Sequence, residues 1–220
     1  MKLYFYSGAC SFVPHVIARE LNLDVTVLAA PRPDDAGRAE YLDTINPLGA
    51  VPALQLDDGR VLTQNLAIIE YMAALGEPGV AYPKLGTFEH AQALRWLSFA
   101  NSDLHPAFKP LFAPQRFTPD ETGYPLVKAL AKDRVLDLYA YLNTEYEGKE
   151  WIANNQFSAA DVYIYVTYRW ATRLGLDLSA FGHLNQMVKR IQARPAVVTA
   201  LAEQNQAEIK SFVSMGYRGG

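Results

Sequence analysis

The stretch that decides the fold is residues 46–65, which read NPLGAVPALQLDDGRVLTQN. Residues 53–56 and 60–63 are short apolar runs on either side of Asp57-Asp58-Gly59, and an Asp-Gly turn between two such runs strongly indicates a β-hairpin. Residues 65–75 follow with apolar side chains at helical spacing. The stretch therefore predicts a strand, a tight turn, a second strand and a helix.

The residues before this stretch predict a β-α-β unit. Two short runs of β-branched or aromatic residues, 3–6 and 25–28, are separated by a helical pattern over 11–21, and a further helix is expected over 38–45. Gly- and Pro-rich residues 76–79 and 83–86 then mark a domain boundary. Beyond the boundary the periodicity is helical throughout, with helices expected over 87–105, 127–147, 159–174, 181–193 and 195–206.

The predicted fold class is therefore α/β plus all-α: a small domain over residues 1–78, a linker over 79–86 and an all-helical domain over 87–220. Ser158 and Asp161, just before an apolar run, predict a capping box at the start of the helix over 159–174. This motif is structural, and no chemistry is assigned to it.

The composition is that of a globular protein. The chain has 220 residues, 50% of them hydrophobic and 20% charged, with a net charge of −3, which excludes a disordered chain. The pI near 5.8, without a basic tract, argues against nucleic-acid binding. No apolar run approaches the roughly 18 residues of a membrane span, and the N-terminal residues turn polar too soon for a secretory signal. The single cysteine excludes an internal disulfide and a Cys-rich zinc site, and favours the cytoplasm.

That one cysteine, Cys10, is placed where a strand turns into a helix. Unpaired N–H groups and the helix dipole favour negative charge there, so a thiol has its pKa lowered. The Ser11 hydroxyl is a donor to that thiolate, or to a thiolate brought by a ligand. Val13 occupies the position of a resolving cysteine, which excludes dithiol exchange and leaves monothiol chemistry. The alternative is that Cys10 is a small buried apolar residue.

Two further places have features of a ligand site. Val51-Pro52, at a strand entrance, is where a cis peptide would present the Val51 backbone to an extended ligand, although an ordinary trans loop is the alternative. Gln64-Asn65 stands at a helix N-terminus of the kind that binds carboxylates, although the residues taken alone favour simple capping by Asn65.

A polar stripe follows the linker. Ser98, Asn101, Ser102 and His105 are spaced i, i+3, i+4 and i+7, which places them on one helix face. A solvated face usually carries Lys and Glu instead, so the stripe favours a ligand-facing role. His105, with a reference pKa of about 6.5, is a candidate hydrogen-bond donor to a thiolate or a proton donor. No metal-ligand spacing occurs, and no metal site is expected.

These motifs together resemble the cytosolic glutathione transferases, and the bacterial beta class in particular. The resemblance rests on Gly8-Ala9-Cys10-Ser11, the Asn-Pro-x-Gly-x-Val-Pro-x-Leu pattern of residues 46–54, and three further segments: residues 62–68, Leu104-His105 and 157–161.

The resemblance implies a thioredoxin-like N-terminal domain that binds glutathione, a helical C-terminal domain and a homodimer. Glutathione is the implied co-substrate, with no prosthetic group, and it would lie along the domain boundary. Cys10 and His105 are the implied catalytic residues. The implied glutathione-binding residues are Ser11, Val51, Pro52, Gln64, Asn65, Ser98, Ser102 and Asp103, of which Asp103 does not share the face of the stripe and is assigned to the partner subunit's ligand.

The chain departs from the family pattern at four places. Relatives more often have Glu-Ser or Gln-Ser where Gln64-Asn65 stands, and beta-class relatives tend to have Asn at Ser98 and Lys at Pro106. Phe5 stands where many relatives have Tyr, with Tyr4 and Tyr6 on either side.

Three functions are compatible with the sequence. The first is conjugation of the glutathione thiolate to an electrophilic hydrophobic substrate, for which Phe108, Phe112, Tyr163 and Trp170 are candidate lining residues. The second is glutathione-dependent thiol transfer or peroxidase chemistry through a Cys10 mixed disulfide. The third is a binding protein that has kept the fold and lost catalysis.

Overall fold

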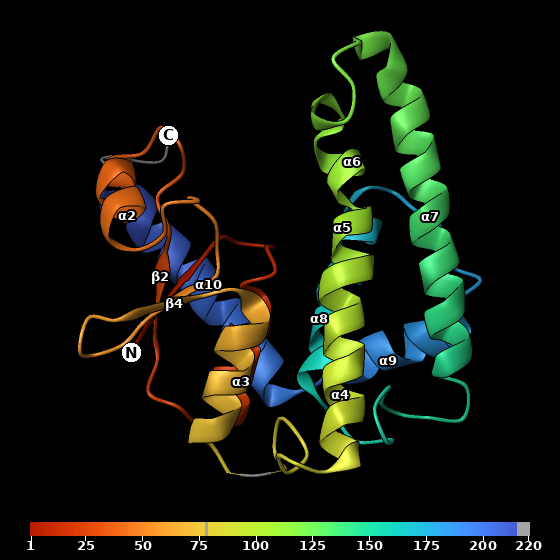
Figure 1. The fold of residues 1–220 in the computed structure, drawn as a ribbon, viewed down its shortest axis with the longest axis horizontal. Helices are drawn as coiled ribbons and strands as arrows, with labels where there is room; N and C mark the ends of the chain where they lie inside the picture. The colour runs from red at the N-terminus through yellow and green to blue at the C-terminus, as the bar shows by residue number, and fades with distance from the viewer. Residues whose placement is uncertain (78, 215–220) are drawn as a thin grey trace. The chain divides into compact units, whose positions relative to one another are not determined.

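The computed structural model describes residues 1–77 and 79–214, with side chains described as far as Ala207. Its contacts divide the chain into two compact units (Figure 1). The first unit contains residues 1–82 together with the C-terminal residues from 192 onward, and the second contains residues 83–191. Each unit is described by itself.

The first unit is built on a four-stranded mixed sheet. β1 (Lys2–Phe5) pairs in parallel with β2 (Thr26–Ala29) and antiparallel with β3 (Ala53–Gln55), which in turn pairs antiparallel with β4 (Val61–Thr63). The strand order is β2-β1-β3-β4. The expected hairpin is confirmed: Leu56 donates its N–H to the Arg60 carbonyl at 2.8 Å.

Three helices accompany the sheet, and the side chains of β1 separate its two faces. Leu3 and Phe5 are fully buried, and so are most side chains of α1 (Phe12–Glu20), which packs on α3 (Asn65–Leu75). Tyr4 points the opposite way and meets Tyr41 of α2 (Arg38–Thr44) edge to face, with ring centroids 5.4 Å apart. The alternation of β1 therefore places α2 on the other face of the sheet.

The last helix, α10 (Pro195–Ser214), groups with the first unit, where it packs on α1 and β2. This differs from the expected division, which placed all residues from 87 onward in the helical domain. Three polar contacts support the grouping: Arg194 Nε and Glu20 Oε1 are 2.6 Å apart, and Glu203 Oε2 lies 2.7 Å from both His15 Nε2 and Arg19 Nε. These partners are about 174 to 188 residues apart in sequence, so no local pattern indicates them.

The second unit consists of helices joined by turns and loops, with no strand among its described residues beyond an isolated bridge between Ala153 and Gln156. In Figure 1 the helices α4 to α6 follow one another in one column with α7 beside it. The rings of Trp96 on α4 and Tyr141 on α7 pack together, with centroids 5.8 Å apart. Its elements are α4 (Phe88–Phe99), the π-helix η1 (Ala100–Leu104), α5 (His105–Ala107), α6 (Lys109–Phe112), the 3₁₀-helices η2 (Pro114–Arg116) and η3 (Glu121–Gly123), α7 (Tyr124–Glu145), α8 (Ala159–Arg173) and α9 (Gly182–Gln192).

The capping box at the start of α8 is confirmed. The Ser158 N–H donates to Asp161 Oδ2 at 3.0 Å, and both residues are buried. Asp161 has a further task, because Tyr146 Oη and the Ile152 N–H each donate to its Oδ1 at 2.9 Å. The carboxylate therefore joins the start of α8 to the end of α7 and the segment that follows it.

Within residues 1–77 and 79–214, none of the helices combines the length and the apolar content that a membrane span requires. Over the same residues, no three or more His, Cys, Asp or Glu side chains gather as the ligands of a metal ion would.

Candidate functional site

Cys10 lies in the turn between β1 and α1, as the sequence predicts. The turn is closed by backbone hydrogen bonds from Ala9 to Tyr6 and from Phe12 to Ala9, both 3.1 Å. Gly8 has a φ of 74°, a left-handed conformation that glycine adopts at little cost. The Cys10 side chain is half-buried at the helix entrance.

Ser11 has a different task from the one expected. Its side chain is fully buried, and its Oγ accepts from the Tyr6 N–H at 3.3 Å and donates to the Tyr6 carbonyl at 3.4 Å. The hydroxyl therefore ties the end of β1 to the start of α1. In this conformation its proton is directed at Tyr6, away from the role of donor to a ligand thiolate.

The loop before β3 meets the Cys10 turn. The Val51–Pro52 peptide bond is cis, and Val51 precedes the strand pairing of β3. The Cys10 thiol lies 3.7 Å from the Val51 carbonyl oxygen and donates to it. Tyr41 Oη and Asn46 Nδ2 both donate to the Ala50 carbonyl, at 2.8 and 2.9 Å, and these bonds hold the loop in place.

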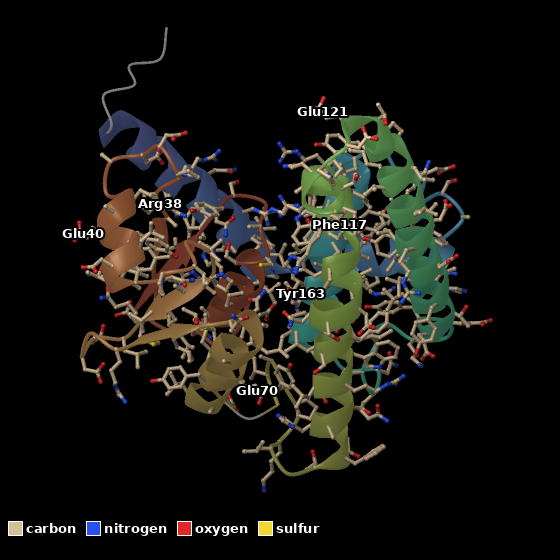
Figure 2. The ribbon with its side chains drawn as sticks, turned by 45° about the horizontal axis from the view of Figure 1, so that its top comes forward. Arg38, Glu40, Glu70, Phe117, Glu121 and Tyr163 are labelled. Carbon is tan, nitrogen blue, oxygen red and sulfur yellow. The ribbon has the colours of Figure 1, made fainter. Side chains whose placement is uncertain are left out.

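Arg38 of α2 holds the same loop at Gly49. Figure 2 labels Arg38 and Glu40 on this helix. Arg38 Nη1 donates to the Gly49 carbonyl at 3.2 Å, and a Cβ on Gly49 would collide with the Arg38 guanidinium. Gly49 also has a φ of 63°. The backbone conformation therefore favours the glycine of the Asn-Pro-x-Gly pattern, and any side chain there would also displace the Arg38 guanidinium from the loop.

The start of α3 is the third segment at this place. Asn65 is 4% exposed, and its Nδ2 donates to the Cys10 carbonyl at 3.0 Å, while its Oδ1 is buried with no hydrogen-bond partner among the described residues. Gln64 is exposed and has a φ of 74°, a conformation that costs a non-glycine residue on the order of 1–3 kcal/mol. Asn65 is not the N-cap of the helix, so the capping explanation is replaced by a tie to the Cys10 turn.

The two tyrosines beside Phe5 have other partners. Tyr6 Oη donates to the Pro31 carbonyl at 2.9 Å and accepts from Arg38 Nη1 at 3.1 Å, and Tyr4 faces α2. Phe5 itself is fully buried. The described side-chain hydrogen bonds of Tyr4 and Tyr6 therefore lead away from the Cys10 turn, whereas the Tyr6 backbone bonds to Ser11 within it.

In the second unit, the helix that carries the polar stripe does not end at Pro106. Proline has no N–H, and its ring collides with the carbonyl four residues earlier in a regular α-helix. The chain widens into the π-helix η1, where the His105 N–H bonds to the Ala100 carbonyl, five residues back, and the helix continues as α5. Such π-turns are frequent at functional sites.

The π-turn divides the stripe, which was expected to share one face. Ser102 is exposed, and its Oγ lies 2.8 Å from the Ser98 carbonyl and 2.7 Å from Asp103 Oδ2. Asn101 and His105 instead turn toward α8, where both bond to Tyr163. The extra residue in the π-turn accounts for the split, because it shifts everything after it around the helix axis.

His105 is half-buried among aromatic rings. Its Nδ1 lies 2.7 Å from Tyr163 Oη, and its ring packs edge to face on Trp170 with centroids 4.8 Å apart. Burial, assisted by the positive charge of Lys109, lowers the pKa of His105 to about 4. The imidazole is therefore neutral at neutral pH and a weak base, which favours a hydrogen-bonding role over that of a proton donor or acceptor.

Of the four aromatic residues expected to line an acceptor site, two are inaccessible. Phe108 and Tyr163 are 0% and 1% exposed, and Trp170 is 9% exposed. Phe112 is half-exposed and stacks on Phe108. Phe117, labelled in Figure 2, is equally exposed and was not singled out by the sequence, because one aromatic residue in an irregular segment gives no periodic signal.

The sequence-predicted site residues thus form two groups, one in each unit. In the first unit the structure joins Cys10 to Val51 and to Asn65, with Ser11, Pro52 and Gln64 adjacent in sequence. In the second unit it joins Ser98, Ser102 and Asp103 to one another, and places His105 with Asn101 and Tyr163.

Comparison with known proteins finds two family models that together match most of the chain. Residues 8–75 match the model of the glutathione S-transferase N-terminal domain, and residues 99–195 match that of the C-terminal domain. The chain belongs to the glutathione S-transferase family. Glutathione S-transferase GST-4.5 of Xanthomonas campestris pv. campestris is 35% identical to this chain, and the match covers 91% of this chain and 97% of the relative. Glutathione S-transferase GstA of Escherichia coli O157:H7 is 32% identical over 93% and 98%.

Solved structures agree with this family assignment. A sphingomonad glutathione S-transferase, solved in complex with glutathione, has 35% identity and a TM-score of 0.81 over 93% of this chain and 99% of its own. The glutathione S-transferase of Xylella fastidiosa also has 35% identity, with a TM-score of 0.83 over 93% and 98%. A beta-class enzyme of Sphingomonas chungbukensis is 35% identical, with a TM-score of 0.80. The expected resemblance to bacterial glutathione S-transferases is therefore confirmed.

Proposed function

We propose that this protein is a glutathione transferase that conjugates the glutathione thiolate to electrophilic hydrophobic substrates. The observation that carries the proposal is the meeting of three segments in the first unit of a glutathione S-transferase family member. The Cys10 turn contacts the Val51 carbonyl on one side and the Asn65 side chain on the other. No local sequence rule requires these segments to meet, and all three were candidate ligand sites for independent reasons.

Each part has a chemical role in the proposal. The N-terminus of α3 at Gln64-Asn65 binds the γ-glutamyl carboxylate, because unpaired N–H groups and the helix dipole favour an anion. The Asn65 Nδ2 is occupied by Cys10, so the contribution of Asn65 comes from its backbone. The Val51 backbone, beside Pro52, pairs with the cysteinyl part, and Cys10 and the helix entrance lie at the sulfur. Ser11 supports that turn. Glutathione binding is also proposed for Ser98, Ser102 and Asp103, and a catalytic role for His105.

The reaction is a nucleophilic displacement. The glutathione thiol loses its proton, the thiolate forms a carbon–sulfur bond with the electrophile, and a leaving group such as halide departs with its electron pair. Donors at the helix entrance lower the pKa of the bound thiol and so raise the thiolate fraction. The exposed face of Phe112 provides an apolar surface for a hydrophobic acceptor.

Thiol transfer through Cys10 is the second candidate, favoured by the half-buried position of this sole cysteine. The Cys10 thiolate attacks the glutathionyl sulfur of a mixed disulfide between glutathione and a substrate thiol, so that a Cys10–glutathione disulfide forms and the substrate thiolate leaves. The thiolate of a second glutathione then attacks this disulfide, which releases Cys10 and forms oxidised glutathione. Both reactions balance without another redox partner.

One experiment separates the two reactions. We expect the wild type to conjugate glutathione to an aryl halide, and Cys10→Ala and His105→Ala to lower kcat/KM by about tenfold or more. Intact mass after incubation with oxidised glutathione reports the adduct on Cys10, and Cys10→Ser serves as the isosteric control. A Cys10 adduct with little conjugation favours thiol transfer. Neither conjugation nor an adduct, together with no retention on immobilised glutathione, contradicts both candidates and leaves a binding protein.

We also propose a cytoplasmic homodimer with a role in detoxification. Exposed apolar side chains support the dimer: Leu126 and Leu130 lie one turn apart on α7, 64% and 62% exposed, and Phe88 at the start of α4 is 72% exposed. A stable dimer buries such groups. Sedimentation velocity should give one species of twice the chain mass, and a single monomeric species contradicts this.

A further inference from the structure

Arg38, labelled in Figure 2, joins three segments of the first unit that are separate in the sequence. Its Nη1 lies 3.1 Å from both Tyr6 Oη and the Pro31 carbonyl oxygen, and 3.2 Å from the Gly49 carbonyl oxygen. Tyr6 follows β1, Pro31 follows β2 and Gly49 precedes β3. These three strands are neighbours in the sheet, so one guanidinium nitrogen connects the ends of three adjacent strands.

Two of these partners are fixed to each other. Tyr6 Oη donates to the Pro31 carbonyl at 2.9 Å, so Tyr6, Pro31 and Arg38 form a closed set of hydrogen bonds where β1 and β2 end. The guanidinium also lies over the Tyr41 ring, 5.9 Å from its centroid, which is a cation–π contact. Because the guanidinium is held there, its hydrogen bond to Gly49 ties the loop before β3 to the sheet.

The Val51 loop, residues 46–52, is held at three consecutive carbonyl groups, of which that of Ala50 has been described above. The Arg38 guanidinium donates to the first, that of Gly49, and the Cys10 thiol donates to the last, that of Val51. A Cβ on Gly49 would collide with the guanidinium, so the loop backbone lies directly against it. Arg38 therefore fixes the loop at a point two residues before Val51.

The Cys10 turn has supports of its own. Ser11 Oγ bonds to the Tyr6 backbone, and Asn65 Nδ2 donates to the Cys10 carbonyl at 3.0 Å. Neither contact involves Arg38. Removal of the guanidinium is therefore expected to loosen the Val51 loop and to leave the turn that carries the thiol in place.

We propose that Arg38 is a positioning residue that holds the Val51 loop in the conformation in which the Val51 backbone pairs with the cysteinyl part of glutathione. A loop that is already ordered loses less conformational entropy when its ligand binds, so the bond to Gly49 raises the affinity for glutathione. The chemical step is unaffected, because the Cys10 turn keeps its own hydrogen bonds. This inference rests on the proposed function for its ligand, whereas the effect of Arg38 on the loop is independent of that function.

Separate measurement of KM and kcat distinguishes this role from a merely structural one. Arg38→Met keeps a long side chain without the donors, and should raise KM for glutathione about tenfold with kcat changed less than about twofold. Tyr6→Phe is a milder variant that removes one anchor of the guanidinium, and it should raise KM about threefold. Arg194→Met is the matched control, because it removes an arginine of the same unit that bonds Glu20 through Nε and Nη2. It should destabilise the protein and leave KM unchanged.

Amide hydrogen exchange tests the loop without any substrate. The Gly49 N–H donates to the Asn46 carbonyl at 2.8 Å and reports on the loop, and the Ala9 N–H donates to the Tyr6 carbonyl at 3.1 Å and reports on the turn. Arg38→Met should speed the exchange of the Gly49 amide about tenfold and change that of the Ala9 amide less than about twofold. Arg194→Met should change neither.

Exchange of the Gly49 amide that is unaltered by Arg38→Met, or an equally large rise in KM in Arg194→Met, overturns the inference. A loss of kcat with KM unchanged in Arg38→Met also overturns it, because the guanidinium would then act on the chemical step. The expected exchange pattern in a protein that neither binds nor conjugates glutathione supports the role of Arg38 in the loop and contradicts the proposed function, so the two failures are distinguishable.

Discussion

Replacing Asp161 by alanine is expected to lower the free energy of unfolding by about 3–5 kcal/mol. The Asp161 carboxylate is fully buried and accepts from Tyr146 Oη, the Ile152 N–H and the Ser158 N–H, all within 3.0 Å. Alanine removes the acceptor and leaves these donors buried without a partner, which costs more than the loss of one hydrogen bond. Urea unfolding at pH 7 measures the change directly.

Two matched variants show whether the buried network is the cause. Asp120→Ala is the same substitution at an exposed residue that caps the short helix η3, and it should lower the free energy of unfolding much less than Asp161→Ala. Tyr146→Phe removes a single donor from Asp161 and should cost about 1 kcal/mol. If Asp161→Ala is no more harmful than Asp120→Ala, the network does not stabilise the second unit as described.

The second large effect is a loss of stability in acid, which arises because His15 is protonated more readily in the unfolded chain than in the folded one. This side chain is fully buried, with Nε2 2.7 Å from Glu203 Oε2 and Nδ1 3.4 Å from Gln204 Nε2. Burial lowers the pKa of His15 to about 4, with Arg19 adding to the shift and Glu203 opposing it. In the unfolded chain the pKa is about 6.5, so between pH 6.5 and 4 only the unfolded chain binds the proton.

The stability that His15 contributes is therefore complete above pH 6.5 and is lost as the pH falls toward 4. The loss between pH 7 and pH 4.5 should be about 3 kcal/mol from this residue. His105 acts with the same sign, because its pKa is also lowered to about 4, and Asp161 acts with the opposite sign, because burial raises its pKa to about 6.

His15→Gln isolates the contribution, because the variant keeps His105 and Asp161. The variant should be less stable than the wild type at pH 7, and the gap should shrink by about 3 kcal/mol at pH 4.5. Urea unfolding at the two pH values measures this difference. A gap that stays constant between them means that His15 titrates alike in the folded and unfolded chains, and contradicts the account.

Local signals were sufficient for most elements of the fold. The Asp57-Asp58-Gly59 turn predicted the hairpin because the turn type depends on its own residues. The helix expected over residues 65–75 has those bounds in the structure, and the capping box at Ser158 and Asp161 is present. Each of these features is determined within about ten residues of chain, which is the range over which sequence patterns act.

The features that sequence did not reveal depend on partners far along the chain. The packing of α10 on the first unit rests on Glu203 and Arg194, and their partners lie near residue 20. A proline such as Pro106 disturbs a regular helix, but whether the helix ends or widens into a π-turn there depends on tertiary packing.

The candidate site shows the same division. Cys10, Val51 and Asn65 were each identified from their local context, and the structure brings them together. The inward turn of the Ser11 hydroxyl and the bond between His105 and Tyr163 were not predicted, because side-chain direction follows from neighbours across the fold.

Titration of ¹⁵N-labelled protein with reduced glutathione tests the central claim most directly, because it reports binding residue by residue. We predict saturable shifts of the backbone amides of Val51, Gln64 and Asn65 and of the Cys10 turn, with no comparable shifts along α9. Absence of shifts at millimolar glutathione, or shifts confined to other elements, would contradict the assignment of a glutathione site to the meeting point of the Cys10 turn, the Val51 loop and the start of α3.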